Sequence, residues 1–231
     1  MGYPPRLCFD GALYHLTARG DNREPIFLDA ADYQHYLLLL RRYKDHFRSK
    51  LHAYALMPNH VHLILEPAPE TTVSRIMQCT GITYTKYFNR RYGRVGHVFQ
   101  GRFHSRLIEK DAYLLVASRY VHLNPVRAKL VRRPADYLWS SYRAYQDPPH
   151  DPLRLVDTAD VLSLINPGTH FPHSSYSEFV ETSWGGRSEK EEVLLTRPMI
   201  GSAKFRSTIQ ARFHLSTPRR GRPPHSPKNR T

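Results

Sequence analysis

Two apolar runs separated by a short Pro-Asn turn are the feature that most constrains the fold. The first run covers residues 51–57 and the second residues 60–66. Such runs around a turn predict a β-hairpin. Because strand side chains alternate between the faces of a sheet, His60 and His62 point to one face and the apolar residues between them to the other. Two imidazoles on one face can share a divalent metal, although in a chain with 14 histidines an ordinary polar strand face is the alternative.

The pattern up to residue 124 predicts an α+β fold. Asp29 can cap one helix and Thr71 or Thr72 a second, each followed by apolar residues at helical spacing. Together with expected strands at 11–18, 51–57, 60–66 and 97–108, the order is strand, helix, strand, strand, helix, strand. This is the ferredoxin-like order, an antiparallel sheet with helices on one face.

A further helix is expected from Asp111, as its cap, to Leu123. Pro125 should end it, because the residue before a proline is pushed out of the α region. Another short helix is expected over residues 126–133. Composition changes after Tyr145, so we expect one domain over 1–145 and a C-terminal extension over 146–231, with short helices and a basic disordered tail.

Charge narrows the class of partner. Lys and Arg total 34 against 20 Asp and Glu, a formal net charge of +14, which favours a nucleic acid. No apolar run approaches the ~20 residues of a membrane span, and the first residues contain no signal-peptide core. Cys8 and Cys79 form no metal-spacing pair. We therefore expect a cytoplasmic, nucleoid-associated protein without a membrane partner.

The helix after Asp111 offers a nucleophile. Tyr113, Ala117, Tyr120 and Asn124 fall on one stripe, so Tyr120 and Asn124 share a face at the helix end. A tyrosine oxygen beside a metal-bound phosphate can attack phosphorus. The amide oxygen of Asn124 is a hard ligand suited to Mg²⁺ or Mn²⁺. The alternative for Tyr120 is an ordinary half-buried aromatic residue, one of 15 tyrosines.

These residues resemble a known family. His60-Val61-His62 resembles the HUH motif, two histidines around a hydrophobic residue, and residues 119–128 (RYVHLNPVRA) resemble the tyrosine helix of single-tyrosine HUH transposases. Residues 57–62 (MPNHVH), 100–103 (QGRF) and 139–141 (WSS) are similar to the branch called REP-associated tyrosine transposases. The resemblance extends over about residues 11–145.

The resemblance implies a catalytic domain that cuts single-stranded DNA with Mg²⁺ or Mn²⁺ and links Tyr120 to a 5′-phosphate, leaving a 3′-hydroxyl. His60 and His62 would be metal ligands, and Asn124 the third, where insertion-sequence relatives have glutamine. The family's substrates are hairpin-forming repeats between genes. Some relatives are dimers that exchange the tyrosine helix and others are thought to be monomers, so monomer and homodimer both stay open.

Basic and aromatic residues near the predicted site are candidates to contact DNA. The alternative is that the charges are ordinary solvated surface charges. Phe103 and Tyr84 are candidates to stack on unpaired bases. In the tail, residues 220–223 resemble the core of an AT-hook, with a generic polybasic tail as the alternative. The expected DNA-binding residues are Arg19, Lys86, Arg90, Arg102, Phe103, Arg106, Arg119, Arg127, Arg220 and Arg222.

Two other functions remain as alternatives. One is a DNA- or RNA-binding protein on the same fold without cutting activity. The other is a nickase of the replication-initiator type, which shares the histidine pair but usually carries further helicase or origin-binding regions.

Overall fold

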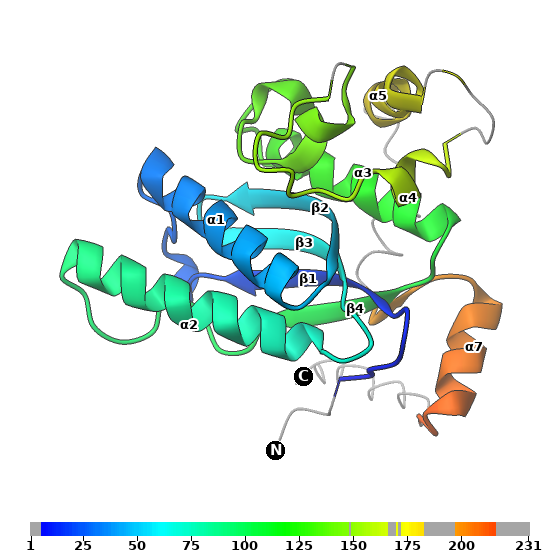
Figure 1. Cartoon of the computed structure of the whole chain (residues 1–231), viewed down its shortest axis with the longest axis horizontal. Helices are drawn as coiled ribbons and strands as arrows, with labels where there is room; N and C mark the ends of the chain where they lie inside the picture. The colour runs from blue at the N-terminus through cyan, green and yellow to red at the C-terminus, as the bar shows by residue number, and fades with distance from the viewer. Residues whose placement is uncertain (1–5, 148, 166–169, 171, 183–196, 216–231) are drawn as a thin grey trace, which may run out of the picture. The chain divides into compact units, whose positions relative to one another are not determined.

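The structure, a computed structural model, describes residues 6–147, 149–165, 170, 172–182 and 197–215. One compact unit extends to Gly201 and contains a five-stranded sheet of order β2-β3-β1-β4-β5 (Figure 1). The first four strands pair antiparallel, and β5 runs parallel to β4. This arrangement confirms the predicted α+β, ferredoxin-like class. The strands are β1 (Leu13–Arg19), β2 (Lys50–Met57), β3 (His60–Glu66), β4 (His104–Ile108) and β5 (Met199–Ile200).

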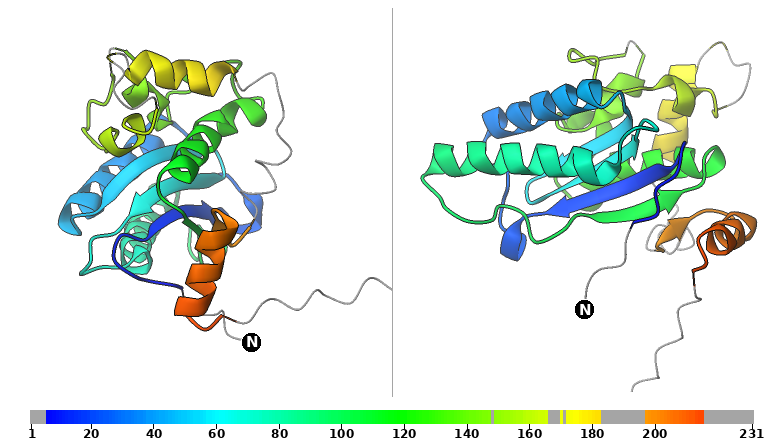
Figure 2. Two further views of the ribbon diagram at one scale, coloured as in Figure 1. Left: turned by 90° about the vertical axis from the view of Figure 1, so that its right-hand side faces the viewer. Right: turned by 60° about the horizontal axis from the view of Figure 1, so that its bottom comes forward.

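Two helices cover one face of the sheet and a third lies against the other (Figure 2). Helices α1 (Ala30–His46) and α2 (Val73–Tyr92) form the first layer, and α3 (Ala112–Arg127) lies on the opposite face. The side chains of Asp29 and Thr72 accept backbone N–H groups in the first turns of α1 and α2, as the sequence predicted. Both faces of the sheet are therefore covered, at least in part, by helices.

A buried carboxylate ties α1 to α2. Asp32 is inaccessible to solvent, and it accepts hydrogen bonds from Tyr87 Oη at 3.1 Å, Tyr92 Oη at 2.8 Å and Arg91 Nη1 at 2.8 Å. It also accepts the backbone N–H of Leu28 at 2.8 Å. A buried charge is tolerated when it is paired and hydrogen-bonded in this way.

The tyrosine helix departs from the sequence prediction at both ends. Asp111 has φ 71° and its side chain makes no capping hydrogen bond, so it is not the expected cap. The helix does not end before Pro125 but includes it and runs to Arg127. Proline removes one helical N–H, yet Leu123 and Val126 are 3% and 4% exposed, and their burial favours continuing the turn. The separate short helix expected over 126–133 is therefore absent from this described stretch.

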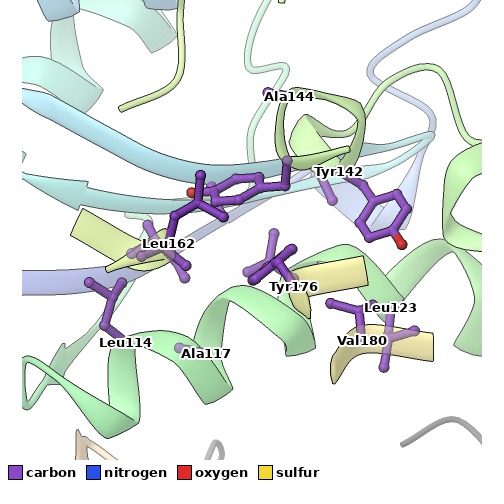
Figure 3. Close-up of a cluster of buried hydrophobic side chains, with 14 of the residues drawn as sticks. Leu114, Ala117, Leu123, Tyr142, Ala144, Leu162, Tyr176 and Val180 are labelled. Atoms are coloured by element: carbon purple, nitrogen blue, oxygen red, sulfur yellow. The ribbon is translucent and has the colours of Figure 1, made fainter. Parts of the chain in front are cut away.

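The core on the α3 side draws on the chain well beyond residue 145. Apolar side chains of α3 pack with Ala53, Ala55 and Ile64 of the sheet, and with residues from the second half of the chain (Figure 3). The contributing elements are the short helices η3 (Ser141–Tyr145) and α4 (Ala159–Leu162), then α5 (Pro172–Thr182) and β5. The compact unit ends at Gly201, later than the boundary expected after Tyr145, because these residues complete that core.

The Trp-Ser-Ser motif closes the outer edge of the sheet. The backbone N–H of Leu56 donates to the Trp139 carbonyl at 2.9 Å, and Ser141 Oγ accepts the N–H of Tyr54 at 2.8 Å. His122 of α3 hydrogen-bonds the same Ser141 Oγ at 2.7 Å and Tyr176 Oη of α5 at 2.8 Å. The motif thus covers an edge strand and fastens α3 to β2.

A second unit begins at Ser202 and contains α7 (Ala203–Arg212), capped by the Ser202 side chain. Arg220 and Arg222 lie outside the described residues, so their expected role in DNA binding stays a prediction. Within the described ranges, no helix has both the length and the apolarity to cross a bilayer.

Candidate active site

The two predicted histidines share one face of β3, beneath α3. His60 pairs with Arg19 of β1 and His62 with Thr17, so the four side chains lie on the same face. The ring centroids of His60 and His62 are 4.9 Å apart and the rings are nearly perpendicular. The structure therefore confirms the prediction that His60 and His62 lie on one face of a strand.

Hydrogen bonds around the turn fix the protonation of His60. Asn59 Nδ2 donates to the Arg23 carbonyl at 3.0 Å, which makes Asn59 Oδ1 the acceptor for His60 Nδ1 at 2.7 Å. Nδ1 of His60 must then carry the proton. In the neutral ring Nε2 keeps its lone pair, the form that a metal requires.

A third histidine stands behind His62. His15 of β1 is 2% exposed, and its Nε2 lies 2.9 Å from His62 Nδ1 in a hydrogen bond between two nearly parallel rings. Thr17 Oγ1 is also 3.5 Å from His62 Nδ1. Both contacts engage Nδ1, which leaves Nε2 of His62 for another partner. Sequence reasoning missed His15, whose only signal was a histidine in the first predicted strand.

All three histidines are held in the neutral form. Burial, followed by the charge of Arg19, lowers the pKa of His60 to about 4. Burial and Arg106 lower the pKa of His15 to about 3. Burial also lowers the pKa of His62 far below its usual value, with smaller contributions from the neighbouring histidines and arginines. Neutral imidazoles at physiological pH are competent metal ligands.

Helix α3 brings Tyr120 to these rings. The centroid of the Tyr120 ring lies 6.0 Å from that of His62 and 5.8 Å from that of His15. The Arg127 guanidinium carbon is 4.8 Å from the centre of the Tyr120 ring. Asn124 donates its side-chain amide to the Tyr120 carbonyl at 3.0 Å, which leaves Oδ1 as its remaining hydrogen-bonding atom. The rings of Tyr120 and of the histidines therefore lie close together within one chain.

The predicted arginines divide into two groups. Arg19 and Arg106 lie close enough to influence the histidines, and Arg127 lies over Tyr120. Arg119, in contrast, is only 6% exposed, and its guanidinium lies 4.2 Å from the centre of the Phe179 ring. This packing into the core argues against the predicted DNA contact by Arg119.

The remaining predicted residues lie on α2 and the loop before β4, on the opposite side of the sheet. Lys86, Arg102 and Phe103 line a single pocket there, and Arg90 is exposed on α2. Tyr84 is fully buried and donates its hydroxyl to the Ile26 carbonyl. The prediction that Tyr84 stacks on bases is therefore wrong, because no face of its ring is accessible. The loop also shortens the expected strand, since only His104–Ile108 of 97–108 forms β4.

Among the described residues, the one group of three or more His, Cys, Asp and Glu side chains close enough to share an ion consists of His52, Glu66 and Asp160. Glu66 is at the opposite end of β3 from His60, and Lys110 and Lys50 already pair with Glu66 and Asp160 at 2.7 Å and 2.8 Å. This cluster is separate from the histidine pair. The role of Asn124 as a third metal ligand stays a prediction.

Comparison with solved structures found proteins similar to this chain. One solved structure, a REP-associated tyrosine transposase bound to a REP hairpin, has 20% sequence identity and a TM-score of 0.55, covering 68% of this chain and 94% of the other. A Deinococcus radiodurans protein provisionally assigned as a transposase has 14% identity and a TM-score of 0.37, covering 56% and 92%. No curated protein sequence matches.

The family comparison is decisive for the classification. The family model described as "Transposase IS200 like" matches residues 8–124, or 117 of the 231 residues. This range contains β1 to β4 and, in α3, both Tyr120 and Asn124. The chain belongs to the IS200-like transposase family.

Proposed function

We propose that this protein is a metal-dependent endonuclease and strand transferase for single-stranded DNA that forms a 5′-phosphotyrosine intermediate at Tyr120. The observation that carries the proposal is the approach of the Tyr120 ring to within 6.0 Å of His62, beside His60. Tyr120 is remote in sequence from the two histidines, and the fold of one chain brings them together. A phenol next to two neutral imidazoles suits attack on a metal-bound phosphate.

The residues present fit a hard divalent cation such as Mg²⁺ or Mn²⁺. His60 and His62 each have Nδ1 engaged in a hydrogen bond, so Nε2 is the nitrogen available for coordination. Asn124 would add its Oδ1, and phosphate oxygens or water would complete the shell. When bound, the cation withdraws charge from the phosphate oxygens and stabilises the charge that develops during attack.

The chemical step balances without an energy source. Tyr120 Oη loses its proton and forms a bond to the scissile phosphorus, the bond from phosphorus to the 3′ oxygen breaks, and that oxygen takes up a proton as the 3′-hydroxyl. The phosphodiester becomes a phosphotyrosyl ester, so a second 3′-hydroxyl can reverse the step and join strands. Arg127 over the Tyr120 ring, with Arg19 and Arg106 near the histidines, supplies positive charge for the phosphate.

The proposed substrate is hairpin-forming DNA with a single-stranded flank. Support comes from the net charge of +14 and from the fold shared with a transposase solved with a REP hairpin. A monomer and a helix-exchanging homodimer are both compatible with the proposal. Within one chain, however, Tyr120 already lies beside its own histidines, which favours a site complete in each monomer.

A binding protein without cutting activity is the alternative of a different class. Such a protein would not need two neutral histidines next to a tyrosine. It would also not need their Nε2 atoms to stay outside the hydrogen bonds that engage Nδ1. That arrangement is electrostatically unfavourable for simple phosphate binding, which protonated side chains do better.

The test is incubation with labelled single-stranded DNA from the repeats beside its own gene, with Mn²⁺, scored for a covalent protein–DNA product. We expect the wild type to form the product. Tyr120→Phe should lose it while retaining hairpin binding, and His60→Ala or EDTA should block cleavage but not binding. Tyr113→Phe, on the same helix, is the matched control and should remain active. A product that persists in Tyr120→Phe would move the nucleophile elsewhere, and activity in EDTA would remove the metal from the mechanism.

A further inference from the structure

Three side chains that the proposed reaction does not use converge at the end of β3 remote from His60. They are His52 of β2, Glu66 of β3 and Asp160 of α4, and one possible ligand atom from each lies within 4.8 Å of the others. Glu66 follows His60 by six residues, about 20 Å along an extended strand, so this cluster and the histidine pair are separate places on the molecule.

A bulge in β2 places His52 in the cluster. The residues before and after His52 pair with adjacent residues of β3, so His52 is an extra residue in the ladder. Such a bulge bends the strand and re-aims a side chain. The His52 side chain is inaccessible to solvent, and its Nε2 lies 3.4 Å from Glu66 Oε2. The bulge thus brings a buried imidazole to a carboxylate.

The other ring nitrogen of His52 carries the proton. Nδ1 is 3.3 Å from the Asp157 carbonyl, which can only accept, so Nδ1 is the donor. In a neutral ring Nε2 then has a lone pair, and within the described ranges it makes no hydrogen bond. A buried lone pair that faces a carboxylate oxygen is unfavourable unless a cation lies between the two atoms. That cation is either a second proton on the ring or a metal ion.

The spacing favours a metal ion over a proton. Hydrogen bonds between charged groups are typically about 2.7–2.9 Å long, shorter than the 3.4 Å between His52 Nε2 and Glu66 Oε2. Two ligands of one tetrahedral ion, with bonds of about 2.0–2.1 Å, are about 3.3 Å apart. One imidazole nitrogen with carboxylate oxygens is a ligand set that suits Zn²⁺ and similar divalent transition metals, and water can fill the remaining position.

The segment that carries Asp160 is anchored beside β2 without any metal. Asp157 donates its N–H to the Leu51 carbonyl at 2.8 Å, and its carboxylate accepts the Leu51 N–H at 2.9 Å. Asp160 follows three residues later in α4, whose Val161 and Leu162 belong to the core that packs against α3. The cluster is therefore held together by the fold itself, and an ion bound there would fasten α4 to the sheet.

Lysines already engage one oxygen of each carboxylate. Lys110 Nζ lies 2.7 Å from Glu66 Oε1, and Lys50 Nζ lies 2.8 Å from Asp160 Oδ2. The other oxygen of each carboxylate is left as a possible ligand. Both lysine side chains are about half exposed and can turn into solvent, but their positive charge lowers the affinity of the cluster for a divalent cation.

We propose that His52, Glu66 and Asp160 form a second cation site, which binds Zn²⁺ or a similar divalent transition metal and fastens α4 to the sheet. The bound ion stabilises the segment against which the tyrosine helix packs. The site does not depend on the proposed nuclease chemistry, because its ligands lie at the opposite end of β3 from His60.

The test uses two substitutions with opposite expected effects. Asp160→Ala removes a ligand, and because this side chain is 43% exposed the fold should tolerate its loss. Lys50→Gln removes a competing charge and should strengthen Zn²⁺ binding by about 2-fold to 5-fold, which corresponds to the energy of one exposed ion pair. Asp45→Ala is the matched control, since Asp45 is also an exposed carboxylate in an ion pair, with Arg41.

Zn²⁺ binding is measured by calorimetry, and its effect on the fold by thermal unfolding of the full chain with and without Zn²⁺. Wild type, Asp45→Ala and His60→Ala should bind Zn²⁺ at this site with similar affinity and unfold at a higher temperature when it is present. Asp160→Ala should lose the temperature shift. Its Zn²⁺ affinity should fall by more than the about 10-fold that the loss of an outer partner of a metal ligand typically costs.

The inference is overturned if Asp160→Ala has the same Zn²⁺ affinity and the same temperature shift as the wild type. A response to Zn²⁺ that disappears in His60→Ala would also overturn it, because the ion would then lie at the histidine pair. Weaker binding in Lys50→Gln would count against it as well, since a lysine that competes with the ion cannot also support its binding.

Discussion

The hydrogen bond from His60 to Asn59 should set how tightly the site holds its cation. Asn59→Ala removes the acceptor of the 2.7 Å bond from His60 Nδ1, so the ring is no longer restricted to the form with a bare Nε2. Loss of such a partner behind a metal-binding histidine typically lowers metal affinity about 10-fold to 100-fold. His60 is half-buried and water can replace the lost acceptor, so we expect a loss of metal affinity near 10-fold. A 10-fold loss corresponds to about 1.4 kcal/mol.

The assay is titration with Mn²⁺, followed by calorimetry or by the electron paramagnetic resonance of the free ion. Asn89→Ala is the matched control, because Asn89 lies near the end of α2, where its Nδ2 donates to the Gly96 carbonyl at 2.9 Å in an exposed hydrogen bond. Asn59→Asp keeps an acceptor and adds negative charge, so it should retain or raise Mn²⁺ affinity. The reasoning is refuted if His60→Ala lowers Mn²⁺ affinity while Asn59→Ala leaves it at the wild-type value.

Two further predictions concern stability. The folded pKa of His15 and of His122 is about 3, against 6.5 in the unfolded chain, so between these values the unfolded chain binds more protons. The free energy of unfolding should therefore fall as pH drops below about 6.5, by up to about 1.4 kcal/mol per pH unit for each histidine. Urea titrations across that pH range measure this, and a urea midpoint that does not change with pH would contradict it. Asp32→Ala should lower the free energy of unfolding by about 3 kcal/mol, because it removes a buried carboxylate that accepts from the Tyr87 and Tyr92 hydroxyls and from Arg91. Asp45→Ala removes only the exposed pair with Arg41 and should cost about 0.5 kcal/mol or less by the same titration. Equal effects of the two substitutions would count against the buried network.

The features predicted correctly from the sequence are those that depend on near neighbours. The hairpin, the common face of His60 and His62 and the caps at Asp29 and Thr72 each follow from residues within a few positions. The element order then restricts the fold to few topologies. The end of α3 was mispredicted for the opposite reason. Pro125 is locally unfavourable in a helix, and only packing against distant segments makes the longer helix the better solution.

His15 could not be assigned to the site from sequence, because its contact with His62 depends on strand register. A shift of β1 by one residue would turn His15 to the other face of the sheet. The register is set by how Leu13, Leu16 and their neighbours fill the layers on both faces, which is a property of the whole core. The burial of Arg119 could not be predicted either, because the Phe179 ring that covers it lies on α5, far along the chain.

The bond between His15 and His62 also restricts where protons can be when a cation is bound. If His62 coordinates through Nε2, its Nδ1 carries the proton and donates to His15 Nε2, so the proton of His15 must lie on Nδ1. That Nδ1 is buried and has no hydrogen-bond partner among the described residues. An unsatisfied buried N–H costs about 1–3 kcal/mol. In the proposed metal site, His15 would orient His62 but would also weaken its hold on a bound cation, because the tautomer that frees Nε2 of His62 leaves a buried donor of His15 unpaired. A cation held by this pair would bind loosely until phosphate oxygens complete its shell, which couples metal binding to the arrival of DNA.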